Sequence, residues 1–170
     1  MGTLQEGHVT ITGNVLSDVH TNLWLDSCRG VVVTGNTFWM GFEHNLLIEN
    51  SSHIIVGPNN FDRNPRYSYG RSLQAKNQLV VRNSRDCTLT GLHISYVQDS
   101  PAALSLNACD RMHVNGLTIL DCDIGLRLES VTRSRFSNCM IRDDRGEQDS
   151  LKIVVENSRD NEFDSSLKPN

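Results

Sequence analysis

The sequence predicts an all-β fold in which short parallel strands are wound into a solenoid. The first observation behind this prediction is an internal repeat, since a block first seen at residues 22–38 recurs five more times and ends at residues 152–168. The second is that apolar residues occupy alternate positions in each block, the period of a half-buried strand. The third is a recurrent Gly-Asn pair, as at Gly13 and Gly35, where the chain must turn within about two residues.

Aligning the six blocks places residues of one type in columns. Two apolar columns lie two residues apart at the start of each block, and a third and a fourth follow after a polar stretch. This alternation excludes a helical stripe of apolar residues. The first column is Leu23, Leu46, Leu79, Leu104, Leu126 and Ile153, and the third is Val33, Val56, Leu89, Val114, Phe136 and Phe163.

Each block therefore predicts three short strands, which in the second coil are residues 23–26, 31–34 and 37–39. One coil passes through all three strands, and like residues stack on like in neighbouring coils about 4.8 Å apart. We expect one domain over residues 1–170, a parallel β-helix of about six to seven coils. The period excludes a β-propeller blade, and the pattern L-x-x-L-x-L-x-x-N of a leucine-rich repeat is absent.

The corners of the predicted coils explain the asparagines. Asn14, Asn36 and Asn59 share one column after the second strand, where side-chain amides can bond along the stack as an asparagine ladder. A second polar column marks the turn after the first strand. We interpret both columns as turn residues rather than ligands. The second column is Ser27, Asn50, Asn83, Ala108, Ser130 and Asn157.

Coils that read G-I-x-L-x-N-S-x-x-x-x-I-x-G-N-x-F resemble the right-handed β-helix repeats of the pectate-lyase-like (pectin lyase-like) superfamily. The resemblance covers about His8 to Phe163. It implies a parent protein that binds or cleaves polysaccharide and that is extracellular or periplasmic. The motifs N-T-D, G-H-D and R-I-K of polygalacturonases and D-P-H of mannuronan epimerases are absent, so the resemblance predicts the fold and no particular reaction.

Length, charge and the ends of the chain limit the partners. A net charge of −4 and a pI near 5.8 disfavour nucleic acid and anionic membranes, and no run of apolar residues is long enough for a transmembrane helix. The chain enters the repeat in mid-coil at Val9, so we expect the C-terminal part of a longer β-helix. Its open first coil would be covered by preceding coils or by another protomer.

The cysteines and acidic residues indicate no cofactor. Five cysteines without a C-x-x-C pair are interpreted as free packing thiols. Calcium is an alternative in the acidic loop at residues 142–150, although this loop lacks the ordered D-x-D-x-D-G spacing. The acidic residues of that loop are Asp143, Asp144, Glu147 and Asp149.

Candidate catalytic residues lie on the outer face of the sheet formed by the first strands, where the superfamily places its substrate. Asp26 and Glu49 occupy adjacent coils, and their carboxyl groups are expected about 5 Å apart, as in a retaining glycosidase. Arg82 follows in the same row and completes the candidate catalytic set. The alternative interpretation is that these are solvated charges at strand ends, with arginines offsetting the acids.

Candidate substrate-binding residues are aromatic and charged side chains beside that row. Trp24, Arg127 and Glu129 lie on the outer face of the first sheet, although a following loop with Trp39, Met40 or Phe42 could instead cover Trp24. A long loop insertion at residues 62–77 supplies cations for acidic groups and rings for sugars. Its alternative role is to pack tyrosines on a neighbouring coil. The residues selected from the loop are Arg66, Tyr67, Tyr69 and Arg71.

Two hypotheses for function follow. In the first, the chain binds or cleaves polysaccharide along its first sheet, as a lyase or a glycoside hydrolase if it is an enzyme. In the second, it is a non-catalytic β-helix that binds glycan or mediates assembly, like a stalk or tailspike. The second is favoured if Asp26, Glu49 and Arg82 are paired with other groups.

Overall fold

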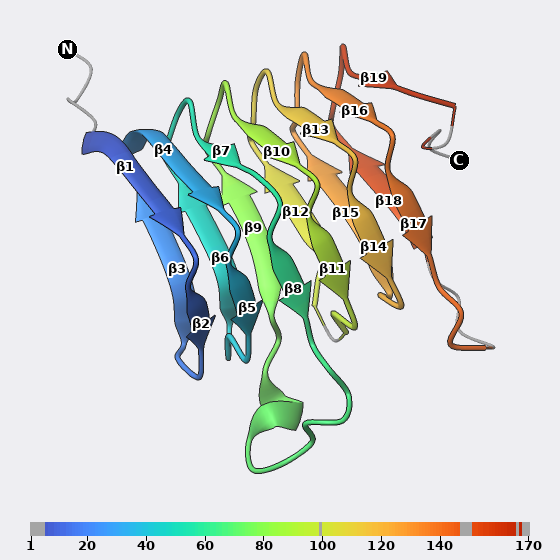
Figure 1. Ribbon diagram of the computed structural model, residues 1–170. Coiled ribbons are helices and arrows are strands. Elements are labelled where there is room, and N and C mark those ends of the chain that lie inside the picture. Colours follow the sequence, from blue (N-terminus) through green and yellow to red (C-terminus); the bar gives the residue numbers. More distant parts are fainter. Residues whose placement is uncertain (1–5, 99, 147–150, 166, 168–170) are drawn as a thin grey trace.

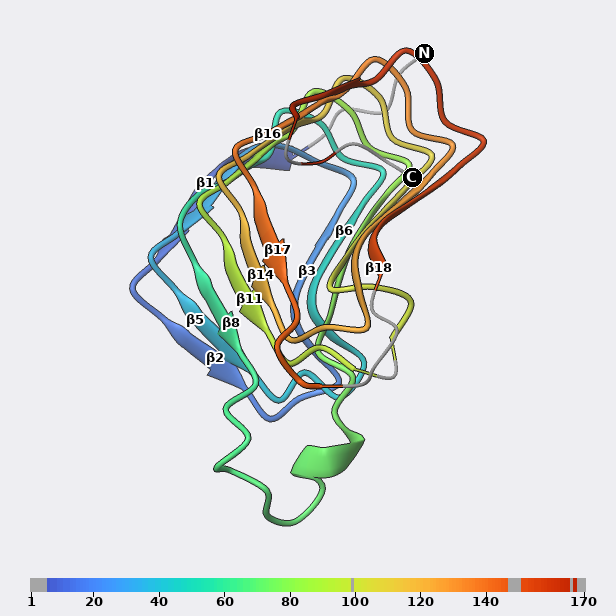
Figure 2. The same ribbon diagram turned by 90° about the vertical axis from the view of Figure 1, so that its right-hand side faces the viewer.

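The computed structural model describes residues 6–98, 100–146, 151–165 and 167, which form a parallel β-helix (Figure 1). The predicted fold class is confirmed, because every strand pair is parallel and successive strands of one sheet come from successive coils. Viewed along the axis, the coils superpose as three walls around a common interior (Figure 2).

We number the three sheets by the order of the predicted strands. Sheet I contains β3 (Thr21–Asp26), β6 (His44–Glu49), β9 (Gln78–Arg82), β12 (Leu104–Asn107), β15 (Ile124–Glu129) and β18 (Leu151–Glu156). Sheet II contains β1 (Glu6–Thr12), β4 (Cys28–Thr34), β7 (Ile55–Val56), β10 (Thr88–Thr90), β13 (His113–Asn115), β16 (Arg135–Ser137) and β19 (Glu162–Phe163). Sheet III contains β2 (Val15–Ser17), β5 (Thr37–Trp39), β8 (Asn60–Asp62), β11 (His93–Ser95), β14 (Thr118–Leu120) and β17 (Met140–Arg142).

The apolar columns of the sequence form the interior. Leu46 stacks between Leu23 and Leu79 in sheet I, and the rings of Phe38 and Phe61 stack in sheet III with centroids 4.6 Å apart. Both phenylalanines are fully buried. Because each of these side chains contacts its equivalents in the coils before and after, the alternation of apolar residues determines the register of every strand.

The corners have the backbone conformation that their residue types predict. Gly13 and Gly35 have φ of 71° and 67°, a region that glycine occupies at little cost. Beside them, Nδ2 of Asn14 donates to Oδ1 of Asn36, and Nδ2 of Asn36 donates to Oδ1 of Asn59, each at 3.0 Å. The amides thus bond to one another between coils, and this pairs the buried side chains of Asn36 and Asn59.

A single helical turn interrupts the strands within the described residues. This 3₁₀ turn, η1 (Ser72–Gln74), lies in the long loop between β8 and β9, which projects from the corner between sheets III and I (Figures 1 and 2). No helix in the described ranges has the length and apolar character needed to span a bilayer.

Candidate functional site

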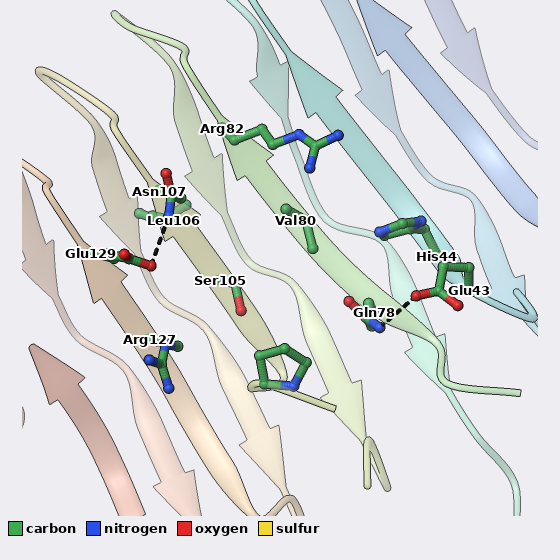
Figure 3. A pocket seen from close by; sticks show the side chains of 11 residues that line it. Glu43, His44, Gln78, Val80, Arg82, Ser105, Leu106, Asn107, Arg127 and Glu129 are labelled. Atoms are coloured by element: carbon green, nitrogen blue, oxygen red, sulfur yellow. Dashed lines mark hydrogen bonds between the residues drawn. The ribbon is translucent and has the colours of Figure 1, made fainter. Parts of the chain in front are cut away.

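A groove of about 790 Å³ lies on the outer face of sheet I (Figure 3). It crosses β6, β9, β12 and β15, so four consecutive coils contribute to it. Outward side chains of parallel strands stand in register, and this is why residues far apart in sequence meet here. The groove is lined by Glu43, His44, Gln78, Val80, Arg82, Pro101, Ser105, Leu106, Asn107, Arg127 and Glu129.

One row of charged and amide side chains at the strand ends begins with Glu49 beside the groove and continues through the groove itself. Glu49, Arg82, Asn107 and Glu129 are in register on adjacent strands. Nε of Arg82 donates to Oε1 of Glu49 at 2.5 Å, and Nδ2 of Asn107 donates to Oε2 of Glu129 at 2.8 Å. The row therefore consists of two pairs, each with one donor and one acceptor.

The opposite end of the groove is formed where β6 and β9 begin. Glu43 accepts hydrogen bonds from Nζ of Lys76 at 3.0 Å and from Nε2 of Gln78 at 3.2 Å. The hydrogen bond from Lys76 holds the pKa of Glu43 below its usual range. This carboxylate is consequently ionised and fixed in position at neutral pH.

His44 and Ser105 supply polar atoms that the protein leaves unpaired. Burial lowers the pKa of His44, and the nearby Arg82 acts in the same direction against the opposing charge of Glu43. The ring is therefore neutral at pH 7. Nδ1 of His44 and Oγ of Ser105 are both buried without a hydrogen-bond partner among the described residues. Buried polar atoms left unpaired cost folding free energy, and these two are too enclosed for a ligand to reach without a local rearrangement.

Three of the residues selected from the sequence line this groove: Arg82, Arg127 and Glu129. Asp26, Glu49 and Trp24 lie on β3 and β6 beside it. Asp26 accepts hydrogen bonds from Nδ2 of Asn50 at 2.8 Å and from Oγ of Ser27 at 3.2 Å. Glu49 is 8% exposed and bound to Arg82. Both candidate catalytic carboxylates are thus already paired.

Trp24 is exposed on the outer face of sheet I, whereas the alternative expectation was that the following loop covers it. It is 60% exposed, so the following loop does not cover it. The reason is that Trp39 lies on β5 in sheet III, where it contacts Tyr67 and Tyr69 instead. Trp24 lies in the row of Leu47, Val80 and Arg127, which places an exposed ring on the strand next to β6 and two strands from Val80.

The long loop does not bring its selected residues to the groove. Arg66, Tyr67, Tyr69 and Arg71 are absent from the groove lining, and the two tyrosines pack on the side of sheet III. The two tyrosines thus have the packing role that was the alternative for this loop, since Trp39 belongs to the neighbouring coil. Only the end of the loop reaches the groove, through Lys76 and its ion pair with Glu43.

Several residues that line the groove are not among the candidate site residues that the sequence predicts. Glu43 and His44 precede the first apolar column of their block, although β6 already begins at His44 and pairs it with Gln78. The two residues are consecutive, so strand alternation would turn their side chains to opposite faces, and the irregular register between His44 and Leu46 has no signal in the repeat. Ser105 and Asn107 lie on the outward face that the repeat predicts for sheet I, but nothing in their residue types or spacing distinguishes them as binding residues.

Among the described residues, no three histidine, cysteine, aspartate or glutamate side chains are placed to hold a metal ion. None of the five thiols, all within the described ranges, forms a disulfide, and burial raises the pKa of Cys87, Cys109 and Cys122 to about 11. In the acidic loop, Asp143 and Asp144 are bound by Arg145 and Arg142, both at 2.7 Å. Glu147 and Asp149 lie outside the described residues.

Comparison with known proteins identifies the chain's relatives. The crystal structure of a "putative glycosyl hydrolase" from Parabacteroides merdae is similar to 91% of this chain and 80% of its own, with a TM-score of 0.58 and 12% sequence identity. This likeness concerns the fold and agrees with the pectin lyase-like repeats seen in the sequence. No curated protein matches the chain significantly. The model of one family, described as "Periplasmic copper-binding protein (NosD)", matches residues 2–138, and the chain therefore belongs to the NosD family of β-helix proteins.

Proposed function

We propose that this chain is a polysaccharide-binding β-helix module, which holds its ligand in the groove on sheet I and does not cleave it. The groove itself is the observation that carries the proposal. It presents two arginines, two carboxylates and two amides around the apolar Val80, and three of these groups, Arg82, Asn107 and Glu129, are in register on adjacent strands. Hydroxyl groups of a sugar chain can donate to the carboxylates and accept from the arginines and amides.

The pairing of the carboxylates favours binding over cleavage. A glycosidase needs one protonated carboxyl group and one free carboxylate on either side of the bond. Here Glu49 is bound to Arg82, Glu129 to Asn107, and Asp26 to Asn50. The lowered pKa of Glu43 also opposes a role as general acid, because this group is ionised at neutral pH.

The comparisons support the proposal in part. The structural relative is named as a glycosyl hydrolase and has the same fold, which is compatible with a sugar ligand. The description of the family places its members in the periplasm, and we propose a periplasmic or extracellular location for the parent protein. The same description names copper. The described residues do not fit such a site, because no suitable group of three ligands exists there and four of the five thiols are buried.

Titration calorimetry with oligosaccharides of galacturonate, mannuronate and glucose tests the proposal. At least one of these should bind, and Arg127→Ala should weaken binding by about tenfold, because Arg127 lines the groove and supplies charged donors. Arg159→Ala is the matched control, since Arg159 is also exposed but lies outside the groove. An equal loss of saccharide affinity in both variants would contradict binding in the groove. Unsaturated products or new reducing ends would show that the chain cleaves the saccharide.

A further inference from the structure

A second, smaller hollow lies on the outer face of sheet III, on a different wall of the solenoid from the groove. It has a volume of about 200 Å³. Its floor comes from the outward rows of β2, β5 and β8, where Val15, Thr37 and Asn60 are in register. The long loop closes one side. The lining residues are Val15, Thr37, Trp39, Asn60, Asp62, Asn64 and Tyr67.

Three aromatic rings meet at this hollow. The centroid of Trp39 lies 5.6 Å from that of Tyr67 and 6.4 Å from that of Tyr69, and the two tyrosine centroids are 6.5 Å apart. The ring planes are inclined at 52°, 66° and 81° to one another. Tyr67 and Tyr69 are 50% and 57% exposed. Aromatic rings in mutual contact are usually buried, so this degree of exposure leaves apolar ring surface available to a ligand.

Hydrogen-bonding groups surround the rings. Oδ1 of Asp62 accepts a hydrogen bond from Oγ of Ser95 at 2.7 Å, which fixes the carboxylate at the edge of the hollow. Oδ1 of Asn64 accepts from the backbone N–H of Arg66 at 3.0 Å. Among the described residues, the Nδ2 groups of Asn60 and Asn64 have no protein acceptor. The hollow thus combines flat apolar walls with fixed donors and acceptors.

The charges around the hollow exclude one kind of ligand. Aromatic rings with a carboxylate can bind an organic cation. Here, however, residues 62–77 contain one acid, Asp62, and the cations of Arg63, Arg66 and Arg71. Their positive field opposes a cation and favours a neutral or acidic ligand. The volume is also below the roughly 300 to 1,000 Å³ of pockets for larger small molecules.

We propose that Trp39 and Tyr67, with Asp62, Asn60 and Asn64, form a second glycan site that takes one sugar ring of a neutral or acidic saccharide. The ring stacks its C–H face on the aromatic walls, and its hydroxyl groups bond to the carboxylate and amides. The site is separate from the groove on sheet I, because the two share no lining residue. Saccharide binding at this second site therefore does not depend on whether the groove on sheet I binds polysaccharide.

Tryptophan fluorescence reports on this site directly. The chain has two tryptophans, so Trp24→Phe leaves Trp39 as the single emitter. Tetrasaccharides to hexasaccharides of galacturonate, mannuronate and glucose are titrated into this variant. We expect a saturable change in Trp39 emission with at least one series. Adding Tyr67→Ala should weaken the apparent affinity by roughly fivefold to tenfold, while Tyr67→Phe, which keeps the ring, should preserve it.

Two further measurements separate the outcomes. Arg127→Ala in the same background removes a groove residue and should leave the Trp39 response unchanged, which distinguishes this site from the groove. Circular dichroism establishes that each variant is folded. The proposal is overturned if no saccharide changes Trp39 emission, if Tyr67→Ala leaves the response intact, or if tetramethylammonium chloride changes it where saccharides do not.

Discussion

Cys28 is the most accessible of the five thiols. It is half-buried, whereas Cys87, Cys109, Cys122 and Cys139 are buried. Burial raises the pKa of Cys28, but its sulfur still reaches the surface near Asp26. The thiolate is the reactive form, so a thiol that is both buried and protonated resists modification.

We predict that Ellman's reagent modifies one thiol in the native protein and the other four only after unfolding. Three of those four have a pKa of about 11 in the folded protein, so thiolate is scarce at pH 8 for as long as they stay buried. Counting released chromophore in buffer and in urea checks this. Cys28→Ser should abolish the native reaction, and rapid modification of all five in buffer would contradict the buried positions.

Ala108 occupies a left-handed position that its column normally fills with asparagine or serine. Its φ is 50°, close to the 50° of Asn50 and Asn83 and the 49° of Asn157. Alanine in this region is strained by about 1–2 kcal/mol, whereas asparagine tolerates it. The side chain is exposed, so a larger residue has room.

Ala108→Asn should therefore raise the free energy of unfolding by about 1 kcal/mol. Urea denaturation followed by circular dichroism measures it. Ala108→Val is the matched comparison, because a β-branched residue is worse in this region and should lower stability. If asparagine lowered stability as much as valine, the strain argument for this corner would fail.

At the scale of elements, arginine–aspartate pairs connect consecutive coils at the corner before sheet II. Nε and Nη2 of Arg111 bind the carboxylate of Asp86 at 2.6 and 2.7 Å, and Nε of Arg133 binds Asp110 at 2.8 Å. These bonds hold the pKa of both aspartates below the usual value of 3.8. A carboxyl group whose pKa is lower in the folded state stabilises the fold above its unfolded pKa.

The lowered pKa of these aspartates predicts that the folded protein loses stability in acid. The contribution of Asp86 is fully present above about pH 4 and is lost as the pH falls through its folded pKa. The urea midpoint should therefore fall between pH 5 and pH 2, and Asp86→Asn should make that fall shallower. Asp144→Asn is a control in an exposed pair within a single loop. If the urea midpoint of Asp86→Asn fell with pH as steeply as that of the unchanged protein, the Arg111–Asp86 pair would not be a cause of the loss of stability in acid.

At the scale of the molecule, the first coil leaves one side of each sheet unpaired among the described residues. β1, β2 and β3 end the strand orders of their sheets. Ile11, Leu16 and Leu23 are only half-buried there, whereas Val33, Phe38 and Leu46 in the next coil are at most 1% exposed. Such an edge offers both backbone hydrogen bonds and apolar surface to another strand.

We expect this 170-residue chain to self-associate with rising concentration through that edge. Val9 pairs with the buried Val31 and is 48% exposed, so Val9→Lys places a charge at the open end and should shift the equilibrium toward monomer. Sedimentation velocity measures the distribution. Ile55→Lys, at an equally exposed position within the solenoid, serves as the control and should change nothing. Equal effects of both would locate association elsewhere.

The repeat predicts which residues of the candidate site share a row, but not which partners their side chains bind. Once the repeat defines which residues face outward, Arg82, Asn107 and Glu129 must stand in one row. Sequence spacing cannot show which neighbours those side chains bind, because an arginine beside a glutamate is compatible with a pair or with two free groups. The interpretation of Asp26 and Glu49 as catalytic depended on that difference.

The sequence alone determined the β-helix, its three sheets and the register of its strands, because stacked identical positions leave a single way to bury the apolar columns. Tertiary structure alone decided where the long loop lies and what its rings contact. Residues 62–77 have no repeat to define their path, so packing of Tyr67 and Tyr69 against Trp39 directs the loop to sheet III. The same packing separates a second hollow from the groove, which no pattern in the sequence predicts.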